Sequence, residues 1–227
     1  MTDKIQFFAY SPITVTNYTV PDKGYPSFSY VIKAVELQED LLAAKVENAN
    51  KTENKTSVNL AFKHILTQIN FSAELESGVT YTVTKIEIMD VNNTGTFTYG
   101  TGDVVGAWSS LSGKISYEYA GKYDATATDN VADFSTNANA LMLLPQTLSA
   151  DAKIAVTYSA VKNGFTTFTG TKEVSLKDKV WGIGKNLRYT LKLSSDATEV
   201  VFTPSVSEWT DETPQPDPVT PVTPLTE

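Results

Sequence analysis

Residues 141–193 read LMLLPQTLSADAKIAVTYSAVKNGFTTFTGTKEVSLKDKVWGIGKNLRYTLKL, and this stretch decides the fold. Apolar and polar residues alternate over 154–158, which is the period-two pattern of a half-buried strand. The dipeptide Asn163-Gly164 follows, and it tolerates the positive φ angles of a tight hairpin turn. Apolar residues return over 165–176 and over 187–193. The stretch predicts three strands of an antiparallel sheet and contains no reactive chemistry.

Length and composition exclude several classes of function. The chain has 227 residues, which suits one large all-β domain or two small ones. Its formal net charge is −8 with a single arginine, Arg188, and this argues against nucleic acid as a partner because such binding needs a clustered basic surface. Cysteine is absent, which excludes disulfides and cysteine-based metal sites or nucleophiles.

The sequence contains no membrane or export signal that we can identify. No apolar run approaches the roughly 20 residues of a membrane-spanning helix. The first residues, MTDK, are not followed by the apolar region of a signal peptide. We therefore expect a protein that is either cytoplasmic or exported by a segment outside this sequence.

Further segments have the alternation of strands. They are residues 4–10, 28–32, 58–62, 65–75, 79–91, 96–99, 115–119 and 199–203. The alternation changes phase around 64–68 and again between Val83 and Ile86, which predicts a bulge or a short turn at each place. Asn92 to Gly95 has turn composition. Residues 34–47 are ambiguous, and a helix there is as compatible with the pattern as its absence.

Two candidate sites lack the partners that their chemistry requires. His64 is the only histidine, and neither an HExxH nor a GxSxG motif accompanies it, which favours a packing or turn role. Asp90 to Gly95 begins like a calcium-binding loop, but position 12 is Thr101 where a bidentate glutamate is needed. We expect a plain hairpin turn at this position.

Two further patterns also favour structural interpretations. Glu36, Glu39 and Asp40 lack the arrangement across a cleft that glycoside hydrolysis needs, so a solvated charged edge is expected. Residues 182–185, GIGK, lack the phosphate-loop pattern and precede a strand, so we predict a turn.

Aromatic residues leave a sugar-binding alternative open. They are Tyr10, Tyr18, Tyr25, Tyr30 and Trp108. Such side chains could form a surface on which sugars stack, although aromatic residues in β-proteins more often pack in the core or at sheet edges. A glycan-binding surface lipoprotein on a β-sandwich scaffold is therefore the second hypothesis for function.

Short motifs in a fixed order resemble the fimbrillin (Mfa-like) family of Bacteroidota cell-surface proteins. They are FFAYSP at 7–12, QEDLLAA at 38–44, LAFKHIL at 60–66, LLPQ at 143–146, IAVTY at 154–158, WGIGK at 181–185, YTL at 189–191 and VSEW at 206–209. The positions that carry the resemblance are expected to be packing and turn positions. They are Asp40, Phe62, His64, Pro145, Gln146, Trp181, Gly184, Lys185, Tyr189 and Trp209.

The resemblance implies an all-β fold of two tandem transthyretin-like, Greek-key β-sandwich domains. We place the first at residues 1–97, lacking upstream strands, and the second at 98–210. Residues 211–227 form a proline-rich acidic tail with five of the ten prolines. The family's role implies a non-enzymatic pilus subunit or adhesin without cofactors, located at the cell surface or outer membrane.

The resemblance also implies how such a subunit assembles. A surface protease trims an N-terminal strand after an arginine, and a strand from the next subunit fills the exposed groove. Other pilus subunits are thus the expected partners, with a host or bacterial surface ligand or a glycan left open. The lipid-bearing cysteine and the cleavage arginine of the family do not occur before residue 7, so attachment to the outer membrane would need an upstream anchor. The proline-rich tail favours a tip or accessory subunit over a stalk subunit.

Overall fold

The computed structural model describes residues 4–49, 57–119, 123–126, 131–134, 140–196 and 200–209. Within these ranges the chain forms fifteen strands and one short 3₁₀ helix, so the predicted all-β fold is confirmed. The elements are β1 (Ile5–Ser11), β2 (Thr16–Thr19), β3 (Ser27–Val31), η1 (Val35–Leu37), β4 (Leu42–Ala49), β5 (Lys63–His64), β6 (Thr67–Glu74), β7 (Val79–Tyr99), β8 (Gly106–Tyr119), β9 (Tyr123–Thr126), β10 (Val131–Asp133), β11 (Leu141–Leu143), β12 (Lys153–Lys162), β13 (Phe165–Ser175), β14 (Lys185–Lys192) and β15 (Val201–Glu208).

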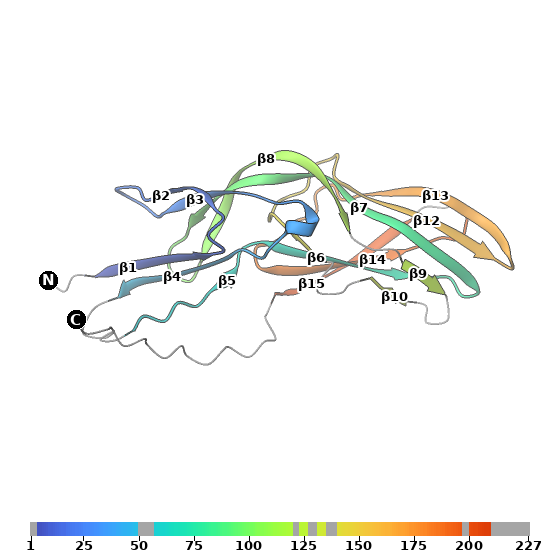
Figure 1. The fold of residues 1–227 in the computed structure, drawn as a ribbon, viewed down its shortest axis with the longest axis horizontal. Helices are drawn as coiled ribbons and strands as arrows, with labels where there is room; N and C mark the ends of the chain where they lie inside the picture. The colour runs from blue at the N-terminus through green and yellow to red at the C-terminus, as the bar shows by residue number, and fades with distance from the viewer. Residues whose placement is uncertain are drawn as a thin grey trace, which may run out of the picture.

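These strands form three sheets in an elongated molecule (Figure 1). The largest has the order β13-β12-β7-β3-β2, with β8 and β9 also paired to β7. A second sheet has the order β10-β6-β14-β15, with β11 paired to β6, and the third is β1-β4-β5. Figure 1 shows β7 and β8 running along the molecule, with β1 to β5 toward the end that holds the N-terminus and β12 and β13 toward the other.

Strand β7 connects the two ends of the molecule. Its first half pairs with β12 and its second half pairs with β3. The register with β12 shifts between Lys85 and Val83, where the sequence predicted a change of phase, so that prediction is confirmed. A second irregularity, in the pairing with β8, lies between Ile88 and Val91, and Asp90 there has a φ of 58°.

The turn predicted at Asn92 to Gly95 is wrong, because these residues lie inside β7. A Cβ on Gly95 would come within 2.8 Å of a Leu111 methyl group and 3.0 Å of the Trp108 ring. Glycine therefore allows close packing here and does not make a turn. The calcium-loop pattern at the same residues lies in a paired strand.

The helix that the sequence left open over 34–47 is not formed. Only Val35–Leu37 forms a single 3₁₀ turn, and Leu42–Ala49 is strand β4. Pairing of β4 with β1 supplies its backbone with partners in place of helical bonds, so tertiary contacts override the local propensity.

The strand predicted at 58–62 is not formed. Residues 57–62 lie outside any strand, and only Lys63–His64 beyond them pairs with β4. The predicted hairpin at Asn163-Gly164 is confirmed, because the two residues have φ angles of 53° and 82° between β12 and β13. GIGK at 182–185 forms the predicted turn into β14.

The division into domains at residue 97 stays a prediction. Strand β6 and the first half of β7, which precede residue 97, pair with β14 and β12, which follow it. The proline-rich tail, 211–227, lies outside the described residues.

Candidate functional site

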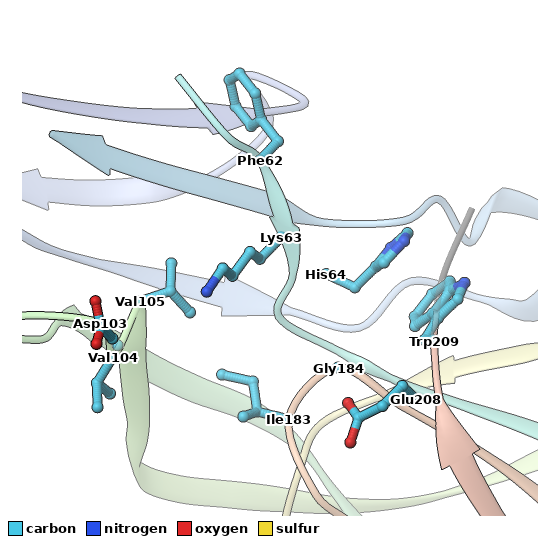
Figure 2. Close-up of a pocket in the computed structure, with 11 residues that line it drawn as sticks. Phe62, Lys63, His64, Asp103, Val104, Val105, Ile183, Gly184, Glu208 and Trp209 are labelled. Carbon is cyan, nitrogen blue, oxygen red and sulfur yellow. The ribbon is translucent and has the colours of Figure 1, made fainter. Parts of the chain in front are cut away.

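An open groove lies at the flank of the β1-β4-β5 sheet. Its volume is about 540 Å³, and β5, the start of β8, the turn before β14 and the end of β15 form its walls. Its lining is largely apolar and includes Phe62, Val104, Val105, Ile183 and Trp209. Figure 2 shows Lys63 pointing toward Val105 and Asp103, with His64 pointing toward Trp209. Phe62 is 44% exposed and Val104 60% exposed, so apolar surface is open to solvent here.

A smaller cavity continues the groove toward β4. It has a volume of about 200 Å³ and is lined by Lys45 on one side and Ala61 on the other. Lys63, Asp103 and Val105 line both cavities. The space between β4 and the loop before β8 is thus a single open flank.

Strand β4 presents an incompletely paired edge to this flank. On one side it pairs with β1 from Ser11↔Leu42 to Ile5↔Ala49. On the other side only Leu42 and Ala43 pair with β5. Ile65 N donates to Leu41 O at 3.0 Å. Because the direction of the backbone N–H and C=O groups alternates along a strand, every second residue after Leu41 directs these groups to this side. The N–H and C=O groups of Lys45 and Glu47 therefore face the open flank, and no strand in the described chain pairs with them there.

Side-chain bonds hold β4 against the loop before β8. Glu47 accepts hydrogen bonds from Tyr25 Oη at 2.5 Å and from Gly102 N at 3.0 Å. Lys45 Nζ donates to Gly100 O and to Glu47 Oε2, the latter at 3.3 Å. The hydrogen bond from Tyr25 is the largest of the effects that lower the pKa of Glu47. The same bond raises the pKa of the Tyr25 hydroxyl. These bonds fix the position of β4 relative to the loop before β8.

Three of the predicted positions meet at one end of the groove. Asp40 Oδ2 lies 2.6 Å from His64 Nδ1. The His64 ring stacks on the Trp209 ring with centroids 4.0 Å apart and planes 7° apart. The arrangement connects β5 with the end of β15, which fits the packing role expected for His64.

Gly184 and Lys185 join the same region. Gly184 N donates to Leu66 O at 2.9 Å, and Trp209 N donates to Gly184 O at 3.0 Å. Gly184 has a φ of 64°, and a Cβ there would lie 3.0 Å from His64 O, so glycine is required. Lys185 forms an ion pair with Glu208.

The remaining predicted positions lie away from the groove, in the core. Trp181 Nε1 donates to Tyr189 Oη at 2.9 Å, and both residues are about 1% exposed. Burial raises the pKa of Tyr189. Gln146 exchanges two backbone hydrogen bonds with Trp181, and its side chain bonds the backbone of Asn92. Pro145, beside Gln146, is half-buried.

The aromatic residues of the sugar-binding hypothesis do not form one exposed surface. Tyr30 is 3% exposed, and Trp108 Nε1 donates to Ile65 O at 2.6 Å. Tyr10 packs on Tyr18 with ring centroids 5.4 Å apart, and Tyr25 bonds Glu47. Sugar binding stays a prediction.

Sequence reasoning missed Lys45, Glu47, Val104, Val105 and Ile183. Lys45 and Glu47 fell in the segment that also suited a helix, Val104 and Val105 lie in a loop without a motif, and Ile183 lies in the GIGK turn but was not singled out. Within the described ranges, no group of three or more metal-binding side chains is found. No helix of that part is long and apolar enough to cross a membrane.

Comparison with known proteins identifies similar chains. A model of a family described as fimbrillin-like matches residues 1–209. A fimbrial protein from Bacteroides vulgatus is 21% identical with a TM-score of 0.69, over 91% of this chain and 78% of that one. A candidate cell adhesion protein from Bacteroides uniformis is 18% identical with a TM-score of 0.53, over 92% and 74%. At these identities the likeness establishes the fold. No protein with a curated description matches.

Replacement of Tyr189 by Phe tests the buried pair in the core. The variant leaves Trp181 Nε1 buried without its acceptor, and we expect a loss of about 1–3 kcal/mol in the free energy of unfolding. Urea unfolding measures it. The control is Tyr18→Phe, which removes a hydroxyl from a ring that is 38% exposed. Equal unfolding midpoints for the two variants would contradict the role given to this bond.

Replacement of Tyr25 by Phe tests the contact at the β4 flank. Without that bond the pKa of Glu47 should rise toward its ordinary value of 4.5. A lowered carboxyl pKa contributes stability above the unfolded-state value that is lost as pH falls through the folded-state value. The variant should therefore lose less stability below about pH 4.5 than the unmodified protein. Titration of Glu47 by NMR measures the pKa, with Tyr10→Phe as control, and an unchanged value would refute this cause.

Proposed function

Because the chain belongs to the fimbrillin-like family, we propose that it is a non-enzymatic fimbrial subunit or adhesin of the cell surface that joins other subunits by β-strand exchange. The observation that carries the proposal is the unpaired edge of β4 beside an apolar groove. In this mechanism a strand from another subunit pairs with β4, and its alternate side chains enter the groove.

The geometry of the flank suits an added strand. Strand addition derives affinity from main-chain hydrogen bonds and specificity from pockets for alternate side chains. Lys45 and Glu47 offer the backbone groups, and Val104, Val105 and Ile183 offer apolar contacts. A partner strand with apolar residues at alternate positions fits both features.

Other sheet edges are less suited to accept a strand. Strand β15 contains Pro204, which has no N–H to donate and which commonly protects edges. Strand β2 has only four residues.

Side chains of β1 pack against the neighbouring layer. Phe8 packs on Tyr25 with ring centroids 5.9 Å apart, and Tyr10 packs on Tyr18. These contacts lie on a face of β1, whose outer edge has no partner strand within the described residues.

The same features support a structural role over catalysis. The groove contains a lysine and two carboxylates, but it lacks a nucleophile with an adjacent base. The histidine at its end is stacked on Trp209 and bonded to Asp40, which suits packing. A location at the cell surface follows from the family's role.

A charge placed on the acceptor strand tests the proposal. We expect Val46→Lys to reduce assembly at least about tenfold, because Val46 shares an apolar face with Phe7 and Ala44, where a lysine would lie beside the apolar residues of the incoming strand. The matched control is Val206→Lys on β15, where the side chain is 61% exposed. The protein is treated with trypsin, run unheated on an SDS gel and viewed by negative stain.

The outcomes are distinct. An SDS-resistant ladder for the unmodified protein and for Val206→Lys, but not for Val46→Lys, supports the proposal when all three unfold at similar temperatures. A ladder for Val46→Lys equal to the unmodified one would exclude the β4 edge as acceptor. A monomer in every case would refute self-assembly by strand exchange.

A further inference from the structure

Residues 58–62, VNLAF, have the sequence of a strand but belong to none. Val58, Leu60 and Phe62 alternate with Asn59 and Ala61. Val58 and Leu60 are half-buried and the other three residues are exposed. No backbone hydrogen bond joins these five residues to any other residue that the structure describes. A segment whose local pattern conflicts with its structure marks a place where function can account for the conflict.

The register of β5 on β4 already determines where this segment would pair. Leu41 bonds Ile65, Leu42 pairs with His64, and Ala43 pairs with Lys63. Antiparallel pairing continues one residue at a time, so the next pairs are Ala44 with Phe62, Lys45 with Ala61, Val46 with Leu60 and Glu47 with Asn59. Lys45 and Ala61 already line the same cavity of about 200 Å³.

The hydrogen-bonding groups match in this register. Because Leu41 and Ile65 form a hydrogen-bonded pair, the pairs Lys45–Ala61 and Glu47–Asn59 would be hydrogen-bonded too. Each pair exchanges two N–H···O bonds, which gives the free groups of β4 their partners. Asn48 has a φ of 59°, and the register of β4 on β1 shifts beside it, so regular pairing ends there.

The side chains match as well. Phe7 pairs with Val46 and Ala9 pairs with Ala44 across β1 and β4, so these residues share one face. In the continued register, Leu60 would lie beside Val46 and Phe62 beside Ala44, on that same face. Phe7 is 37% exposed and Phe62 is 44% exposed, and the pairing would bring this apolar surface together.

We infer that residues 58–62 are a reserve strand: beside the unpaired arrangement described here, the unassembled subunit has a second state in which these residues pair with the free edge of β4, and they leave that edge when a partner strand binds. The first half of this inference rests on the register alone, and the second half rests on the proposed function. The backbone groups of Lys45 and Glu47 can bond only one strand at a time. The reserve strand therefore competes with the partner strand and protects the edge from premature pairing.

Paired cysteines test the first half, because the chain has no cysteine of its own. Val46 and Leu60 would form a non-hydrogen-bonded pair with Cα atoms roughly 4.5 Å apart, which a disulfide can span. We expect the full-length Val46→Cys/Leu60→Cys variant to form an intramolecular disulfide under mild oxidation. In the control, Val46→Cys/Asn59→Cys, the two side chains would point to opposite faces. It should remain reduced.

Assembly of the oxidised and reduced forms tests the second half. A disulfide only in the register-matched variant, with assembly lost when oxidised and restored by reducing agent, supports the inference. No disulfide in that variant, or equal oxidation of both variants, overturns the reserve strand. If the oxidised and reduced forms assemble equally, residues 58–62 do not compete with the partner strand for the edge of β4. If the unmodified protein does not assemble, strand exchange itself fails, while the disulfide result still decides the pairing.

Discussion

The long strand β7 is the constraint on which the architecture depends. It pairs with β12 near its start and with β3 near its end, while β8 lies against its other side. The pairing of this 21-residue strand shifts register at three places, which changes the direction of its side chains between its two ends. The small sheet β1-β4-β5 lies opposite the second half of β7 (Figure 1). No other described strand pairs with the open edge of β4 in this sheet.

That flank combines three properties that seldom occur together on a stable surface. The backbone of Lys45 and Glu47 lacks strand partners, apolar side chains line the adjacent groove, and residues 58–62 with strand composition lie next to it unpaired. An exposed edge of this kind is an aggregation hazard, which natural proteins usually cover or charge. Here Pro204 marks the edge of β15, whereas β4 contains no proline. A controlled pairing site explains the difference.

Local patterns predicted most of the strands, because the alternation over 154–158 and the Asn163-Gly164 turn reflect contacts between neighbouring residues. Predictions failed where distant pairing decides the conformation. Turn-like composition at 92–95 is overridden by strands on both sides of β7, and the helical spacing before β4 is overridden by β1. The family motifs include His64, Gly184 and Trp209, which the structure brings together at one end of the groove. The open edge of β4 depends on the absence of a partner strand, which no local pattern of residues predicts.

Hydrogen exchange at the β4 flank tests the central claim most directly. The amides of Lys45, Glu47, Asn59 and Ala61 would be followed in the monomer and in assembled material. The account predicts that Lys45 and Glu47 become more protected on assembly, whereas Asn59 and Ala61, which pair with β4 in one state of the monomer, are less protected in the assembled material than in the monomer. Fast exchange of Lys45 and Glu47 in the assembled material would show that no strand binds β4 and would contradict the account.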